Sequence, residues 1–195
     1  MAKLAQRLST YTSTVHPGIS IQLQHSVEDV AHVQEVVQAY RPSIIVELGC
    51  GTCGLTLAMR EVCPSHVPIV AVDSFPRPQV PNDRAVEVFG RQTWIVRADT
   101  ITEESFAVTQ KLISGTPSAM MYLDCGGIPD RMRVLEHYGW QLTEGALIGL
   151  HDVSAGVREA DVERMFGEYE MPTQRYMWPE DRDVKTSARF WRIGT

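Results

Sequence analysis

Residues 44–54 read IIVELGCGTCG, a short apolar run that ends in a glycine-rich turn. The run lacks the alternation of apolar and polar residues that a half-exposed strand shows, so it is typical of a strand buried on both faces. The segment that follows, LTLAMREV, has the composition of a helix. A strand, a glycine turn and a helix in this order predict the first unit of an open α/β sheet.

Four further apolar runs repeat this pattern along the chain. The five runs begin at residues 44, 69, 94, 119 and 146, a stride of 25 to 27 residues. Such a stride accommodates a strand, a crossover helix and two loops, and it therefore predicts parallel strands joined by helices. The segments expected to be helical are 55–62, 83–89, 103–113, 129–140 and 157–169, preceded by a helix that begins after Ser26 and ends before Pro42.

Two late runs, 174–178 and 188–193, are close enough in sequence to form an antiparallel hairpin at the end of the sheet. The expected fold class is therefore α/β, a Rossmann-like, doubly wound sheet with helices on both faces. It contains five parallel strands and a C-terminal antiparallel hairpin. The whole chain, residues 1–195, is expected to be a single domain, with residues 1–25 available as a lid or an oligomer arm.

Composition excludes several classes of protein. Hydrophobic residues make up 44% of the 195-residue chain, which is enough for a packed core. Its 18 Lys and Arg residues against 24 Asp and Glu give a net charge of -6, so the protein would repel a nucleic acid backbone. No apolar run approaches the roughly 20 residues that cross a membrane, and the first residues lack the apolar core of a signal peptide. We therefore expect a cytoplasmic protein that acts on a small molecule, with room for a homo-oligomer but not for a separate substrate domain.

The four cysteines, at positions 50, 53, 63 and 125, lie in apolar or glycine-rich segments. Without a secretory route, free thiols are favoured over disulfides. Cys50 and Cys53 form a C-x-x-C pair, but no second pair follows to complete a zinc site.

An acidic residue stands at or just after the end of each of the five apolar runs. Because the carboxyl ends of parallel strands share one edge of a sheet, these residues are expected to lie on the rim where such sheets bind ligands. In the alternative interpretation, each acid merely caps the next helix or is solvated. The five residues are Glu47, Asp73, Asp99, Asp124 and Asp152.

Gly49, Gly51 and Gly54 spell G-x-G-x-x-G, which is also the dinucleotide-binding fingerprint. An NAD(P)-dependent oxidoreductase is therefore one hypothesis. However, Glu47 would repel a bound pyrophosphate, whereas a carboxylate suits a cationic amino acid. Asp73 could accept the two hydroxyls of a ribose. A nucleoside that carries an amino acid instead of a phosphate fits these residues better.

The stretches VELGCGTCG, VAVDS and VRADT resemble the nucleoside-binding series of class I S-adenosylmethionine-dependent methyltransferases. The stretches HPGISIQLQHSVEDV, MMYLDCGG, LIGLHDVSAGV and SARFWRI resemble a narrower branch, the macrocin-type O-methyltransferases and the cephalosporin-hydroxylase-like proteins. The resemblance covers about residues 17 to 193. It implies a cofactor site of Glu47, Gly49, Cys50 and Gly51 at the methionine part, Asp73 and Ser74 at the ribose, Asp99 and Thr100 at the adenine, and Asp124.

The resemblance also implies a place for a metal. In metal-dependent relatives a divalent cation, Mg²⁺, binds acids at the ends of the fourth and fifth strands, and the matching residues here are Asp124, His151 and Asp152. His151 stands where relatives carry a carboxylate, and the histidine that usually follows the fourth-strand acid is replaced by Cys125. We expect Asp124 and His151 to be catalytic, with His151 as the base. The function expected is O-methylation of a small molecule, the alternatives being the oxidoreductase or a non-catalytic nucleoside-binding domain.

Overall fold

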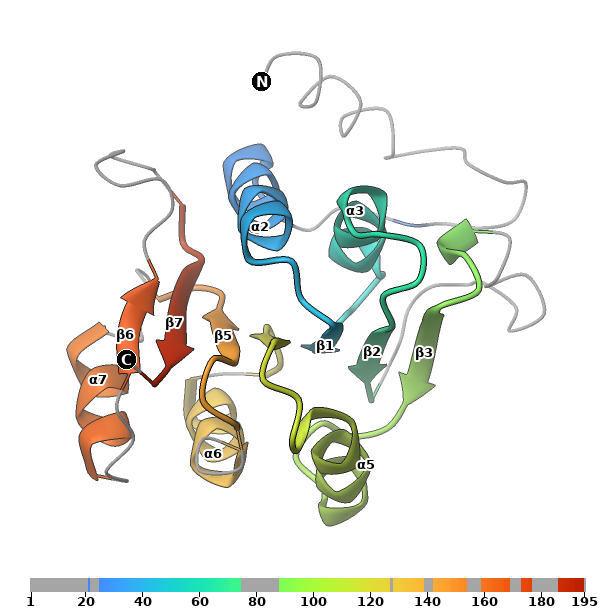
Figure 1. Ribbon diagram of the computed structural model, residues 1–195. Helices are drawn as coiled ribbons and strands as arrows, with labels where there is room; N and C mark the ends of the chain where they lie inside the picture. Colours follow the sequence, from blue (N-terminus) through green and yellow to red (C-terminus); the bar gives the residue numbers. More distant parts are fainter. Residues whose placement is uncertain are drawn as a thin grey trace.

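The computed structural model of the protein describes residues 21, 25–74, 88–126, 128–138, 142–153, 159–168, 173–176 and 186–194. Within these residues, seven strands form one sheet in the order β3-β2-β1-β4-β5-β7-β6 (Figure 1). Strands β1 to β5 are parallel, and β7 runs antiparallel to both β5 and β6. The strands are β1 (Ile44–Leu48), β2 (Ile69–Asp73), β3 (Thr93–Arg97), β4 (Ala119–Leu123), β5 (Leu147–Leu150), β6 (Thr173–Tyr176) and β7 (Arg189–Ile193).

Helices cover both faces of the sheet, as Figure 1 shows: α2 and α3 lie on one side, and α5, α6 and α7 on the other. The α/β Rossmann-like fold class expected from the sequence is thus confirmed, including the antiparallel pair at the C-terminal end of the chain. The helices are α2 (Val27–Tyr40), α3 (Gly54–Val62), α5 (Glu103–Ile113), α6 (Ile128–Tyr138) and α7 (Glu159–Glu168). The expected helix 83–89 and the expected lid 1–25 fall largely outside the described residues. None of the described helices is long and apolar enough to span a membrane.

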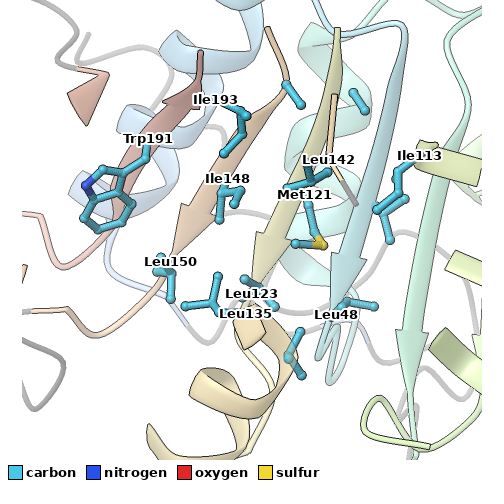
Figure 2. Packing of buried hydrophobic residues seen from close by; sticks show 14 of the residues in the cluster. Leu48, Ile113, Met121, Leu123, Leu135, Leu142, Ile148, Leu150, Trp191 and Ile193 are labelled. Atoms are coloured by element: carbon cyan, nitrogen blue, oxygen red, sulfur yellow. The ribbon is translucent and has the colours of Figure 1, made fainter. Parts of the chain in front are cut away.

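The continuous apolar character of the strands follows from burial on both faces. In β1, Val46 and Leu48 join the core under α5 and α6, while Ile45 joins the core under α2 and α3. Figure 2 shows the first of these cores, in which neighbouring strands each contribute a side chain at a similar height, such as Leu48, Leu123 and Leu150. Because both faces are covered, all five positions of β1 are buried, and Glu47 is its one polar residue.

Local capping sets the ends of α2. The Ser26 hydroxyl accepts the backbone N–H of Asp29 at 3.1 Å and donates to the Asp29 carboxylate at 2.6 Å. The helix ends at Arg41, which has a left-handed φ of 54° immediately before Pro42. A capping residue followed by a proline stop explains why the bounds of this helix could be predicted from the sequence.

The sheet order reverses between β1 and β4, since the chain moves from β1 to β2 and β3 on one side and from β4 to β5 on the other. Ligands of doubly wound sheets bind at the carboxyl ends of the strands where this reversal occurs. The loops after β1 and β4 are therefore where a site is expected.

Candidate functional site

The five rim acids lie at the same edge of the sheet because their strands are parallel. Glu47 and Asp73 are in the last positions of β1 and β2, Asp124 directly follows β4, and Asp99 and Asp152 lie two residues after β3 and β5. Their environments nevertheless differ, so they divide into groups with different chemistry.

The glycine turn after β1 is packed against the loop after β4. Gly49 has a φ of +93°, and a Cβ at this position would lie 2.5 Å from the backbone of Asp124 and Cys125. The space that a side chain at position 49 would take is therefore filled by the protein backbone. Gly51 donates its backbone N–H to the Asp73 carboxylate at 2.8 Å, which holds the turn against β2.

Cys50 and Cys53 lie within the same turn, and both are buried free thiols with their sulfurs 3.4 Å apart. Burial and the neighbouring Cys53 sulfur raise the pKa of the Cys50 thiol, with further contributions from Glu47 and Asp73. A thiol in such surroundings stays protonated and is a poor nucleophile. Cys50 therefore contributes to the turn as a buried, packed side chain.

Glu47 is an acid held inside the protein, with only 1% of its surface exposed. Its Oε2 accepts a hydrogen bond from the Thr56 hydroxyl on α3, whereas its buried Oε1 has no hydrogen-bond partner among the described residues. Burial raises the pKa of Glu47 to about 8, with the charges of Asp124 and Asp73 adding to the shift and the Thr56 bond opposing it. Glu47 is thus mostly protonated at neutral pH and would ionise next to a bound cation.

This raised pKa predicts a pH dependence of stability. Because the folded protein holds the Glu47 proton more tightly than the unfolded chain, the contribution of Glu47 to stability is full below pH 4.5 and is lost as the pH rises to about 8. This loss of folding stability should be on the order of 2 kcal/mol or more in the wild type, and it should be absent in Glu47→Gln. Urea denaturation of both proteins at pH 5, 7 and 9 measures it. Parallel pH profiles of wild type and variant would contradict the prediction.

The other residues predicted for the cofactor occupy the edge of the sheet near β2 and β3. Ser74 and Asp99 are exposed, and Thr100 is buried. The Asp99 Oδ1 accepts the backbone N–H of Ile101 at 3.1 Å, and its carbonyl accepts the Ser105 hydroxyl at the start of α5. Asp99 therefore shapes the turn that leads into α5, whose N-cap is Thr102, and its contact with a cofactor stays a prediction.

A second group of polar residues, which we call the histidine cluster, comprises His25, Asp29, Asp124 and His151. The Asp124 carboxylate lies 2.9 Å from Nε2 of His25 and 3.1 Å from Nδ1 of His151. The Asp29 carboxylate lies 3.7 Å from Nε2 of His151, and the two imidazole rings meet edge to face with centroids 4.5 Å apart. The start of α2 thus closes over the ends of β4 and β5.

Arg131 on α6 binds the acids on the other side of the histidine cluster. It is buried, and its Nη2 lies 3.3 Å from Asp124 and 3.2 Å from Asp152. Its Nη1 donates to the carbonyl of His151 at 2.6 Å and its Nε to the carbonyl of Cys125 at 3.2 Å. One guanidinium group therefore joins the loops after β4 and β5.

The charges in this cluster are strongly coupled. Burial is the largest single influence and disfavours ionisation of both Asp124 and His151, but the hydrogen bonds between them, those to His25 and Asp29, and the neighbouring charges together outweigh it. The pKa of Asp124 is lowered to about 2 and the pKa of His151 is raised to about 10, with Asp29 also contributing to the latter. As arranged here, His151 is an imidazolium at neutral pH, so its predicted action as a base requires that its proton first be displaced.

The structure places the three residues predicted to bind Mg²⁺ together, since His151 Nδ1 lies 3.3 Å from Asp152 as well as 3.1 Å from Asp124. The set does not fit Mg²⁺, however. Mg²⁺ prefers an octahedron of oxygen ligands, whereas this set includes an imidazole and the Arg131 guanidinium already bridges the two carboxylates. We derive no catalytic step through Mg²⁺.

Sequence reasoning missed three members of this site: His25, Asp29 and Arg131. Asp29 lies in the first turn of α2 beside its cap Ser26, yet its carboxylate also accepts the backbone N–H of Ser187 at 2.7 Å, 158 residues later in the chain. His25 and Arg131 carry no local signal.

No protein-family model and no curated protein matches the sequence. The fold, in contrast, is similar to that of solved methyltransferases. A methyltransferase from Geobacter sulfurreducens has a TM-score of 0.57 at 13% identity, over 84% of this chain and 76% of that chain. A proposed rRNA-methylase from Clostridium thermocellum has a TM-score of 0.56 at 8% identity, over 90% and 99% of the two chains.

A proposed caffeoyl-CoA O-methyltransferase from Staphylococcus aureus has a TM-score of 0.59 at 12% identity, over 90% of this chain and 86% of that chain. At these identities the comparison establishes the fold. The protein has the Rossmann-like fold of the methyltransferases, with its acidic residues at the edge of the sheet where the strand order reverses.

Proposed function

We propose that this protein is an S-adenosylmethionine-dependent methyltransferase that methylates oxygen on a small molecule. The observation that carries the proposal is the set of acids around the glycine turn, Glu47, Asp73 and Asp124, in a sheet with the methyltransferase fold. These acids are near enough to one another for the charges of Asp73 and Asp124 to raise the pKa of Glu47. A site of this kind favours the sulfonium and ammonium groups of S-adenosylmethionine and disfavours the pyrophosphate of NAD(P).

In this proposal Glu47 binds the methionine part of the cofactor and Asp73 binds its ribose. The buried Oε1 of Glu47, which has no partner among the described residues, would accept the ammonium group of the methionine part. Asp73 would accept the ribose hydroxyls while it continues to hold Gly51. Cofactor binding and the conformation of the glycine turn would then depend on the same carboxylate.

Methyl transfer itself requires the acceptor oxygen to lie in line with the sulfonium methyl group. As the new C–O bond forms, the C–S bond breaks and its electron pair stays on sulfur, so the cofactor leaves as a neutral thioether. Positioning alone can supply much of the rate, but a hydroxyl acceptor must also lose its proton. We propose that His151 accepts this proton after its own proton has been displaced from the ion pair with Asp124, and that Asp124 orients the imidazole. The net charge of -6 supports a small acceptor over a nucleic acid.

Calorimetry with S-adenosylhomocysteine tests the cofactor assignment. We expect one site per chain, with Asp73→Asn weakening binding about 10- to 100-fold, because a charged acceptor of the ribose hydroxyls is lost. Glu136→Gln, which changes an exposed residue in the last turn of α6, should bind as the wild type does. Absence of binding at millimolar ligand would refute the proposal, and tight binding of NADH in its place would indicate an oxidoreductase. Binding without turnover of any acceptor would indicate a non-catalytic domain.

The state of Glu47 gives a second readout. Because Glu47 is protonated before binding and a carboxylate beside an ammonium group afterwards, uptake of S-adenosylmethionine at pH 7 should release close to one proton. Titrations in two buffers with different ionisation enthalpies measure this release. It should disappear in Glu47→Gln, and an unchanged release in that variant would show that Glu47 does not bind the methionine part.

A further inference from the structure

Strand β3 forms one end of the sheet, and among the described residues it pairs only with β2 (Figure 1). The carbonyl of Gln92 and the backbone N–H of Ala98, directly before and after β3, both bond to β2, at 2.8 and 3.0 Å. Because every second residue of a parallel strand bonds to the same neighbour, the backbone groups of Thr93, Ile95 and Arg97 point away from β2. An edge of this kind can accept a further strand.

Exposed apolar side chains accompany this edge. Trp94 on β3 has 48% of its surface exposed, and Val108 on α5 has 47%. Trp94 lies on the same face of β3 as Val96, which packs against the core under α5 and α6. Val108 is two residues, or about 200° around the helix, from Phe106, whose ring stacks on His137 of α6. Val108 therefore faces away from α6, and the order of the sheet places β3 on that side, as Figure 1 shows. Exposed apolar surface beside an edge strand favours an interaction surface.

We propose that β3 pairs with β3 of a second copy of this chain, antiparallel about a two-fold axis, so that one sheet continues through a dimer. An axis that brings Ile95 opposite Ile95 also brings Trp94 opposite Val96 of the second copy, and each such pair occurs twice. It places Arg91 opposite Asp99 of the second copy, and both of these side chains are exposed. The edge is thus complementary to itself in charge and in apolar contacts, which favours a second copy over an unrelated strand.

The backbone pattern of β3 agrees with this register. In an antiparallel pair, residues directly opposite each other alternate between hydrogen-bonded and non-hydrogen-bonded pairs. With Ile95 at the centre, the residues whose backbone groups point outward, Thr93, Ile95 and Arg97, form the hydrogen-bonded pairs. Trp94 and Val96 then fall in the non-hydrogen-bonded pairs, where side chains approach more closely. An aromatic and a β-branched side chain are a favourable combination in such a pair.

Neighbouring registers lack the matched charges. An axis one residue earlier in β3 would place Arg91 opposite Arg97 of the second copy, and like charges directly opposite each other are destabilising. An axis one residue later would place Asp99 opposite Thr93, which offers it no charge. The register centred on Ile95 is therefore the one that we assign.

Sedimentation velocity on the full chain without cofactor measures the association. We expect a dimer at micromolar concentrations. Trp94→Glu should weaken it about 100-fold, because two apolar contacts are lost and two carboxylates would be buried against valine. Val27→Glu, which places the same charge on an exposed valine at the start of α2, should leave dimerisation unchanged. Circular dichroism verifies that each variant is folded.

A pair of charge variants tests the register. Arg91→Glu and Asp99→Arg should each weaken the dimer about 10-fold, because each places like charges opposite one another twice. An equimolar mixture of the two variants should associate as the wild type does, since every acidic side chain of these pairs again faces an arginine in the mixed dimer.

Hydrogen exchange followed by mass spectrometry gives a separate readout of strand pairing. The backbone N–H groups of β3 should become more protected as the protein concentration rises and the dimer forms. A chain that is still monomeric at about 100 μM, a dimer insensitive to Trp94→Glu, no recovery in the mixture or unchanged exchange in β3 would each overturn the proposal. Because no cofactor is present, these outcomes are independent of the methyltransferase test.

Discussion

Gly49→Ala is expected to lower the free energy of unfolding by about 3–5 kcal/mol, or to prevent folding. The added Cβ would lie 2.5 Å from backbone atoms of Asp124 and Cys125, which cannot rotate away as a side chain could. The φ of +93° adds the strain that a left-handed conformation imposes on any residue with a Cβ. Guanidinium denaturation followed by circular dichroism measures the loss.

Gly115→Ala is the matched control for this prediction. Gly115 also has a positive φ, +71°, but nothing lies within 4 Å of the position that its Cβ would take. Gly115→Ala should therefore lose only the stability that a left-handed backbone conformation costs an alanine, about 1–2 kcal/mol. If the two variants lost equal stability, the contact between the loops after β1 and β4 would not be what restricts position 49 to glycine.

Arg131→Met is expected to cost about 3–5 kcal/mol of stability. The methionine preserves much of the packing of the side chain but removes the charge that pairs with Asp124 and Asp152, together with the donors to the carbonyls of Cys125 and His151. The Asp124 carboxylate, only 18% exposed, would lose its charged partner, which is strongly destabilising, whereas Asp152 is 45% exposed and contributes less. Thermal and urea denaturation at pH 7 measure the effect.

Arg164→Met provides the comparison with an exposed ion pair. Arg164 on α7 lies 3.8 Å from Asp161, with 69% of its side chain exposed, so its replacement should change stability by less than about 0.5 kcal/mol. In a double variant, Asp152→Asn should recover part of the loss caused by Arg131→Met, because one unpaired charge is removed. A loss in Arg131→Met as small as that in Arg164→Met would rule out a structural role for the buried guanidinium.

The sequence located nearly all the described strands and helices because their signals are local. A strand covered on both faces must be apolar at successive positions, so β1, β2, β4 and β5 could be recognised from composition alone. Both bounds of α2 could be predicted, because Ser26 caps the first turn of the helix and Pro42 follows directly after its last cap residue. The expected helix 83–89 is the one element that the described residues leave largely untested.

The candidate site was predictable only in part. The stride of the runs implied that Glu47, Asp73 and Asp124 share an edge of the sheet, since parallel strands end on the same side. It did not indicate that Glu47 is buried and mostly protonated, or that Asp99 shapes the entry to α5. Those properties depend on what lies next to each carboxylate.

The sequence by itself determined the fold class, the order of elements along the chain and the edge of the sheet that bears the acids. The tertiary structure alone decided that Gly49 packs against the backbone of Asp124, that Arg131 bridges Asp124 and Asp152, and that His25 joins Asp124 and His151. The physical reason is that the first set depends on burial and hydrogen bonding within a few residues. The second depends on contacts between segments tens of residues apart, which no local periodicity records.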